Sequence, residues 1–99
     1  MGAVYATGSW VPHAGQEEQF LAAWHVFAEW SRGMPGAGEI TLTRDLRDPE
    51  RFVSFSRWES IEAVRAWKGH DEFKQRMSVV QRHVDRFAPT ELEVVFLLA

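Results

Sequence analysis

The chain has 99 residues, of which 45% are hydrophobic and 25% charged, a formal net charge of −3, and no cysteine. A chain this short can bury only one core, so we expect a single domain over residues 1–99. The charges of both signs are interspersed, which excludes a basic nucleic-acid surface, and the lack of Cys excludes disulfides, thiolate catalysis and Cys-ligated metal centres.

Aromatic residues are abundant, with five Trp and seven Phe. Such side chains bury large areas, so they fill a core, line a pocket or cover an interface. No apolar run approaches the length of a membrane span, and the first residues lack the basic and apolar regions of a signal peptide. We therefore expect a soluble, cytoplasmic protein that binds neither membrane nor nucleic acid.

The first half of the chain predicts a strand, a helix and then two strands joined as a hairpin. Alternation of small and apolar residues favours the strands, and apolar residues at helical spacing with acidic residues in the first turn favour the helix. Pro12 ends the first strand and Gly33 the helix, while Asp48-Pro49 turns the hairpin. The expected bounds are 3–11, 16–33, 39–46 and 52–58.

The second half predicts a helix broken into two pieces, followed by a last strand. Ser60 is a good N-cap for the first piece, and Gly69 ends it. Asp71 is expected to cap the second piece, whose apolar stripe continues to Phe87 before Pro89 stops it. Residues 91–98 then alternate as a strand that is apolar on both faces toward its end.

The order β-α-β-β-α-β predicts an α+β, ferredoxin-like fold with a four-stranded antiparallel sheet and its first and third strands in the centre. The helices cover one sheet face, and the other face keeps apolar side chains. An exposed patch of this kind is uncommon for a soluble domain. We therefore expect a homodimer in which two sheets pack face to face around a shared, barrel-like core.

Four segments carry a family resemblance that extends over nearly the whole chain. They are the strand and helix at 57–73, the end of the first strand at 8–12, the start of the first helix at 15–20, and the hairpin at 44–52. Through them the sequence resembles the antibiotic biosynthesis monooxygenase family of dimeric α/β barrels. The resemblance implies a small homodimer with a pocket between each sheet and its helices. Some members oxygenate aromatic polyketide phenols without metal or flavin, others cleave haem, and many have no established activity.

Residue by residue, the resemblance disfavours the haem-degrading branch. Trp67 falls where that branch has a pocket Trp. Met77, however, stands where the branch has the iron-ligating His of a Phe-Lys-x-x-His motif, and Gly8 stands where it has an Asn. Quinol-oxidising members often carry His at the position of Trp67, so their motif is not intact either. No cofactor and no metal are expected.

His70, Arg44 and Trp67 are the candidate catalytic residues. An imidazole titrates near neutrality, so His70 is a candidate base for a phenol proton; otherwise it is a surface histidine beside Asp71. Arg44 either stabilises an anion or pairs with a carboxylate near the strand end. Trp67 would form a stacking wall.

A second group of residues is predicted to bind the substrate, although the same spacing is what a core requires. Small residues on the two central strands, such as Gly8 and Ser56, either leave room for a ligand or let the helices pack closely. The favoured function is cofactor-independent oxygenation of an aromatic phenol or hydroquinone. The alternative is a non-catalytic small-molecule-binding or structural protein, and haem degradation ranks third. The predicted substrate-binding residues are Trp24, Phe27, Ser54, Trp58 and Phe73.

Overall fold

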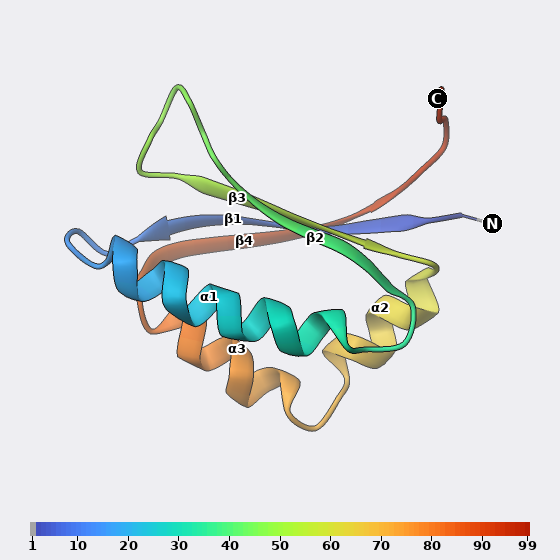
Figure 1. Ribbon diagram of the computed structural model, residues 1–99, viewed down its shortest axis with the longest axis horizontal. Helices are drawn as coiled ribbons and strands as arrows, with labels where there is room; N and C mark the ends of the chain where they lie inside the picture. The colour runs from blue at the N-terminus through green and yellow to red at the C-terminus, as the bar shows by residue number, and fades with distance from the viewer. Residues whose placement is uncertain (1) are drawn as a thin grey trace.

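The computed structural model describes residues 2–99, which form a four-stranded antiparallel sheet with three helices on one face (Figure 1). The order of elements is the predicted β-α-β-β-α-β with the second helix in two pieces, so the α+β ferredoxin-like fold is confirmed. The elements are β1 (Val4–Pro12), α1 (Glu17–Arg32), β2 (Ala37–Arg44), β3 (Phe52–Trp58), α2 (Ile61–Lys68), α3 (Phe73–Gln81) and β4 (Val84–Glu93).

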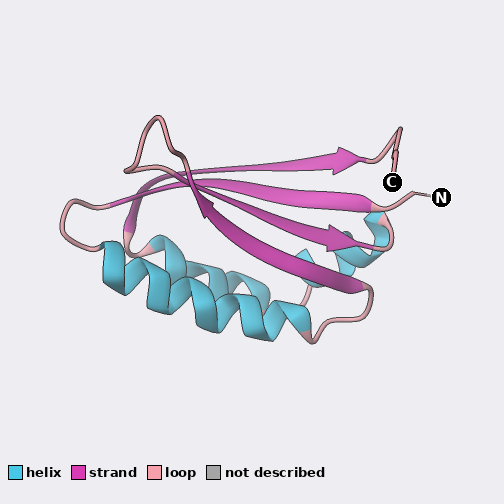
Figure 2. Cartoon of the chain, turned by 45° about the horizontal axis from the view of Figure 1, so that its top comes forward, coloured by secondary structure: helices cyan, strands magenta, loops and turns pink. Residues whose placement is uncertain are grey.

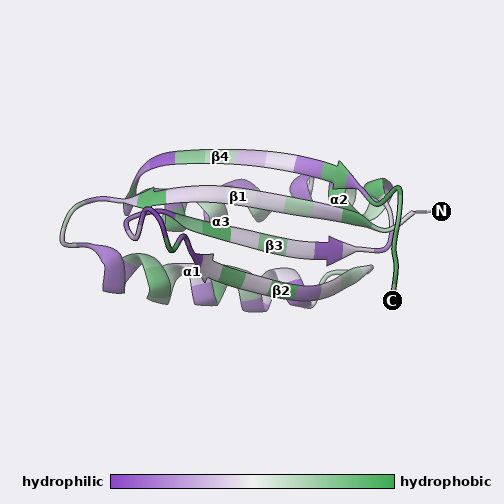
Figure 3. Cartoon of the chain, turned by 90° about the horizontal axis from the view of Figure 1, so that it is seen from above, coloured by the Kyte–Doolittle hydropathy of each residue, from purple (hydrophilic) through white to green (hydrophobic). Residues whose placement is uncertain are grey.

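The strands lie in the order β2-β3-β1-β4, so β1 and β3 are central, as predicted (Figure 3). Small residues meet in the middle of the sheet, because Ala6 pairs with Ser56 and Gly8 pairs with Ser54. All three helices pack beneath the same face, and the opposite face carries no helix (Figure 2). The centre of the sheet therefore presents small side chains to the helices, and its outer face is left uncovered by them.

The core lies between the helices and the sheet and is built mainly from alternate residues of the central strands. Three buried indoles in it each need a hydrogen-bond partner, and each donates its N–H to a serine hydroxyl. Trp10 donates to Ser54 at 3.0 Å, Trp58 to Ser56 at 2.9 Å and Trp67 to Ser31 at 2.9 Å. The buried serines are therefore explained by the tryptophans. The buried apolar residues are Val4, Ala6, Trp10, Phe20, Phe27, Phe52, Trp58, Val64, Trp67, Met77 and Val80.

The broken second helix forms as predicted at its start but differently at the break. The Ser60 hydroxyl accepts a hydrogen bond from the backbone N–H of Ala63 at 3.1 Å, which confirms it as the N-cap of α2. The predicted cap Asp71 is wrong, because α3 starts one residue later with Glu72 in the cap position. The His70 ring instead accepts the N–H of Glu72 at 3.1 Å, so the imidazole holds the break together.

The predicted end of the chain is wrong in both elements. The helix was expected to continue to Phe87, but α3 ends at Gln81, and the last strand is Val84–Glu93, not 91–98. The spacing of Val84 and Phe87 fits a helical stripe. However, the free edge of β1 offers nine residues for pairing, and this long-range pairing overrides the local period. Pro89 is tolerated because β4 is an edge strand.

Two smaller features follow from the hairpin and the tail. β2 is Ala37–Arg44, two residues earlier than expected, because Asp45 belongs to the turn: its carboxylate accepts the N–H groups of Arg47 and Asp48. Beyond β4, the tail bends away from the sheet on the side opposite the helices (Figure 1). Residues 95–98 are apolar and between 70% and 85% exposed there. In residues 2–99, no helix has the length and apolar character needed to cross a bilayer.

Candidate functional site

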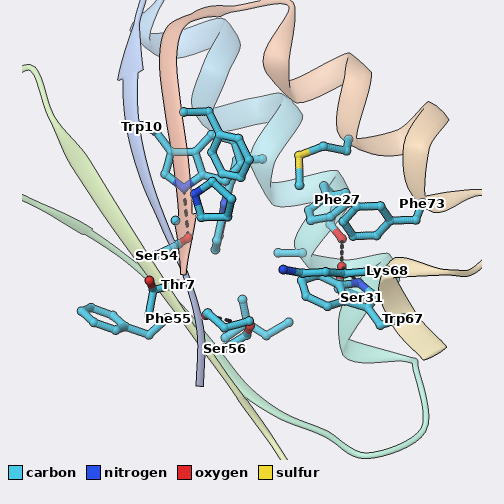
Figure 4. A pocket seen from close by; sticks show the side chains of 18 of the residues that line it. Thr7, Trp10, Phe27, Ser31, Ser54, Phe55, Ser56, Trp67, Lys68 and Phe73 are labelled. Atoms are coloured by element: carbon cyan, nitrogen blue, oxygen red, sulfur yellow. Dashed lines mark hydrogen bonds between the residues drawn. The ribbon is translucent and has the colours of Figure 1, made fainter. Parts of the chain in front are cut away.

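A pocket of about 270 Å³ lies between the helices and the central strands (Figure 4). Its volume is close to the lower end of small-molecule sites, roughly 300–1,000 Å³. The half-exposed Lys68 and the exposed Gln81 are part of its lining, so the pocket reaches the surface beside them. Thr7 and Phe55 lie on the far side of the strands, and Figure 4 shows their side chains pointing away from the helices.

Aromatic side chains from all three helices form the walls. The Trp67 ring lies 5.1 Å from Phe73 at 86° and 6.0 Å from Phe27 at 44°. Behind it, Trp58 stacks on Trp67 at 4.6 Å. The Ser31 hydroxyl accepts the indole N–H and donates to the carbonyl of Phe27 at 2.9 Å. The orientation of Trp67 is therefore fixed by Trp58 against the face of its ring and by Ser31 at its indole N–H.

The central strands form the floor of the pocket, and Gly8 on β1 has no room for a side chain. A Cβ atom at Gly8 would lie 2.7 Å from Nε1 of Trp10, which is too close, and 3.0 Å from Oγ of Ser54, which is a tight contact. Gly8 thus lets Trp10 and Ser54 meet at the base of the pocket. A side chain at this position would require Trp10 to shift.

The polar groups of the lining are mostly occupied. The Ser31 and Ser56 hydroxyls each accept an indole N–H and donate to a carbonyl, and Ser54 accepts from Trp10. Lys68, at the end of α2, reaches across to β4, where its Nζ donates to Oε2 of Glu91 at 2.8 Å. This hydrogen bond, with the charge of Lys68, holds the pKa of the Glu91 carboxyl below its usual value.

The structure brings most of the predicted substrate-binding residues together. Four of them line the pocket, and the fifth, Trp58, is buried behind Trp67 and does not reach it. Of the three candidate catalytic residues, Trp67 lines the pocket and the other two do not. The four lining residues are Trp24, Phe27, Ser54 and Phe73.

His70 and Arg44 lie elsewhere and are held by other partners. The His70 ring packs edge-on against Trp30 at 5.3 Å while its Nδ1 accepts the Glu72 N–H. Arg44 donates two hydrogen bonds to the Glu17 carboxylate, at 2.7 and 3.0 Å. Hydrogen bonding to Arg44 lowers the pKa of the Glu17 carboxyl. The second interpretation of Arg44, a pair with a carboxylate, thus describes its contacts.

Lys68, Gln81 and Phe87 line the pocket, and no sequence pattern points to them. Lys68 follows Trp67 directly in α2, so the helical period alone would not put both at one cavity. Phe87 can be placed at the pocket only once β4 is known to begin at Val84. Within residues 2–99, no three His, Cys, Asp or Glu side chains come together in a way that could hold a metal ion.

Comparisons with known proteins agree with the fold. The model of the antibiotic biosynthesis monooxygenase family matches residues 3–78. A mutant of SnoaB, a cofactor-independent oxygenase from Streptomyces nogalater, has a TM-score of 0.86 with 17% identity, over 97% of this chain and 96% of that one.

Two further solved structures are similar. A proposed antibiotic biosynthesis monooxygenase from Deinococcus radiodurans has a TM-score of 0.85 with 16% identity, over 97% of this chain and 96% of that one. Rv0793 from Mycobacterium tuberculosis has a TM-score of 0.84 with 17% identity, over 98% and 99% of the two chains. At these identities the similarity describes the fold alone. No sequence among the curated proteins matches the chain.

Proposed function

Because the chain belongs to the antibiotic biosynthesis monooxygenase family, we propose that it is a cofactor-independent monooxygenase that oxidises an aromatic phenol or hydroquinone, such as a polyketide, to a quinone. The observation that carries the proposal is the aromatic-walled pocket of about 270 Å³ with Trp67 fixed at its side. A planar ring would stack against this indole, and the surrounding apolar side chains would exclude water.

The reaction needs little from the protein beyond binding and exclusion of water. A phenolate is electron-rich and reacts with O₂. One oxygen atom enters the ring carbon, and the other leaves as water, which takes up the hydrogen lost from that carbon and the proton that the phenol gave up when it ionised. Every electron comes from the substrate, so no external reductant is consumed. Trp67 would orient the ring, and orientation is a large part of such catalysis.

The roles proposed for His70 and Arg44, as base and anion stabiliser, stay predictions. Both side chains lie outside the pocket lining in this structure and are engaged by Glu72 and Glu17. For either role the side chain would have to leave these partners. The proposal therefore rests on the pocket and on Trp67, not on these two residues.

The test is an oxygen-dependent assay with a panel of dihydroxynaphthalenes and anthrones, following quinone absorbance and O₂ consumption. We expect turnover, with ¹⁸O from ¹⁸O₂ in the quinone, and a loss of roughly tenfold or more in kcat/KM for Trp67→Ala. His25→Ala, an exposed α1 residue, serves as the control and should keep wild-type rates. Binding of the same phenols without any oxygen uptake would contradict the proposal.

A second function, small-molecule binding without catalysis, is favoured by one specific observation. No carboxylate and no imidazole lines the pocket within residues 2–99, so a proton acceptor is missing from its walls. The assay above separates the two functions, because a binding protein would retain the ligand unchanged. Haem degradation has no support from Gly8 and Met77, and a haem titration without a Soret shift would dismiss it.

We also propose that the protein is a homodimer joined through the open sheet faces. The outer face exposes Phe55 and Leu92, 39% and 51% exposed, and the apolar tail lies on the same side. The total accessible surface is 6602 Å², against about 5,800 Å² for a compact monomer of this mass. A second copy on this face would bury these apolar side chains.

A further inference from the structure

The pocket contains a single charge. Among the lining residues that the structure describes, Lys68 is the only charged side chain; the others are apolar apart from hydroxyl, indole and amide groups. An ammonium donates hydrogen bonds and accepts none. The pocket thus has a group that recognises an anion and no group that takes a proton from a neutral phenol.

Lys68 is placed to change partners. Its side chain lies alongside the Trp67 ring, with Nζ 6.0 Å from the ring centroid (Figure 4). The bond from Nζ to Glu91 uses one of the three ammonium protons, and the two side chains are 31% and 41% exposed. An ion pair with this much solvent contributes little to stability, so it can be exchanged at low cost.

Glu91 keeps a second positive neighbour when Lys68 moves. Arg65, one turn earlier in α2, also lowers the pKa of the Glu91 carboxyl through its charge. If Lys68 turned to a ligand, the carboxylate would still face Arg65. The release of Lys68 therefore does not leave the Glu91 carboxylate without a nearby cation.

We infer that the pocket selects an aromatic ligand that is already anionic, a phenolate or enolate, and that Lys68 is the counterion that recognises its oxygen after releasing Glu91. This inference rests on the proposed function and specifies its substrate class: a phenol acidic enough to ionise in water. Such a substrate needs no base in the pocket, because its proton is lost to solvent before binding. A neutral ring would leave the Lys68–Glu91 pair intact and gain no interaction with the charge.

The test uses two probes of nearly the same shape, measured by calorimetry at neutral pH. One is 2-hydroxy-1,4-naphthoquinone, an acidic enol that is an anion in these conditions; the other is its uncharged methyl ether. Wild type should bind the anion more tightly than the ether. Lys68→Met, which keeps the length and removes the charge, should weaken the anion by roughly tenfold or more and leave the ether unchanged.

Three further variants sharpen the result. Lys68→Arg should keep the preference for the anion, and Glu91→Gln should strengthen anion binding because the competing carboxylate is removed. Lys74→Met, on the exposed side of α3, is the matched control and should behave as wild type. Circular dichroism of each variant checks that the fold is kept.

Several outcomes would overturn the inference. These are equal affinity of wild type for the two probes, equal weakening of both probes by Lys68→Met, or no binding of either probe. Undiminished turnover of phenols by Lys68→Met would also overturn it while leaving the monooxygenase proposal intact. Selective loss of the anion without any turnover would support the inference and contradict that proposal instead.

Discussion

Trp67 shows how much a single side chain depends on one buried partner. Its indole is nearly enclosed and donates to the Ser31 hydroxyl, which is itself only 1% exposed. The sequence indicates that Trp67 is a wall of a pocket or part of the core, and the structure makes it both. Ser31, the residue before the last one of α1, has no sequence signature, because its role exists only once α1 and α2 pack together.

Ser31→Ala should destabilise the protein by about 1–3 kcal/mol, because the buried N–H of Trp67 loses its acceptor. Urea unfolding followed by Trp fluorescence measures the change. Ser78→Ala, which removes an exposed hydroxyl bonded within α3, is the control and should stay within about 0.5 kcal/mol of wild type. Equal stability of the two variants would show that the Ser31 bond does not matter.

Gly8→Ala should cost about 1–3 kcal/mol, because its methyl group would lie 2.7 Å from the indole nitrogen of Trp10. Thermal unfolding checks the value, and the fluorescence of Trp10 should change when its bond to Ser54 is strained. Gly2→Ala is the control, since the nearest atom to a Cβ there is 3.8 Å away. A fully stable Gly8→Ala would mean that the floor can relax.

At the scale of elements, the hairpin turn is organised by one carboxylate. Asp45 accepts the backbone N–H groups of Arg47 and Asp48 and a bond from Arg51 at 2.8 Å. These bonds favour the charged form, first through the backbone of Arg47, so the pKa of Asp45 lies below its usual value. The Asp48-Pro49 turn is predicted from the sequence, while the role of Asp45 requires the folded loop.

The lowered pKa of Asp45 predicts a pH-dependent contribution to stability. A carboxyl with a depressed folded pKa stabilises the fold at pH values above its unfolded pKa, about 4, and loses that contribution as pH falls through the folded pKa. Asp45→Asn should therefore lower the Tm at pH 7, with the difference shrinking below about pH 4. Glu50→Gln, an exposed carboxyl in the same loop, is the control. A difference that is constant with pH would contradict this.

At the scale of the whole molecule, the open sheet face bears on whether the protein is a monomer or a homodimer. The helices cover one face, whereas the other leaves Phe55, Leu92 and the apolar tail 95–98 in contact with water. A soluble protein rarely keeps such a patch uncovered. The homodimer expected from the sequence stays a proposal, and it can be tested on this face.

Light scattering should give about twice the chain mass of 11.4 kDa. Phe55→Arg together with Leu92→Arg should shift the protein toward monomer, because two buried charges without partners would oppose the interface. Val26→Arg, an equally exposed apolar residue on the helical side, is the control and should keep the wild-type mass. A wild-type monomer at micromolar concentration would remove the dimer.

The sequence by itself determined the fold class, the family and most element boundaries in the first two thirds of the chain. Those features are local: the Ser60 cap, the alternation of β1 and β3, and the apolar stripe of α1 each lie within one segment. Only the tertiary structure decided where β4 begins, because a free edge of β1 competed with a helical period that fitted equally well. The same packing decided the site, since it engaged His70 at a helix break and brought Lys68 to the pocket.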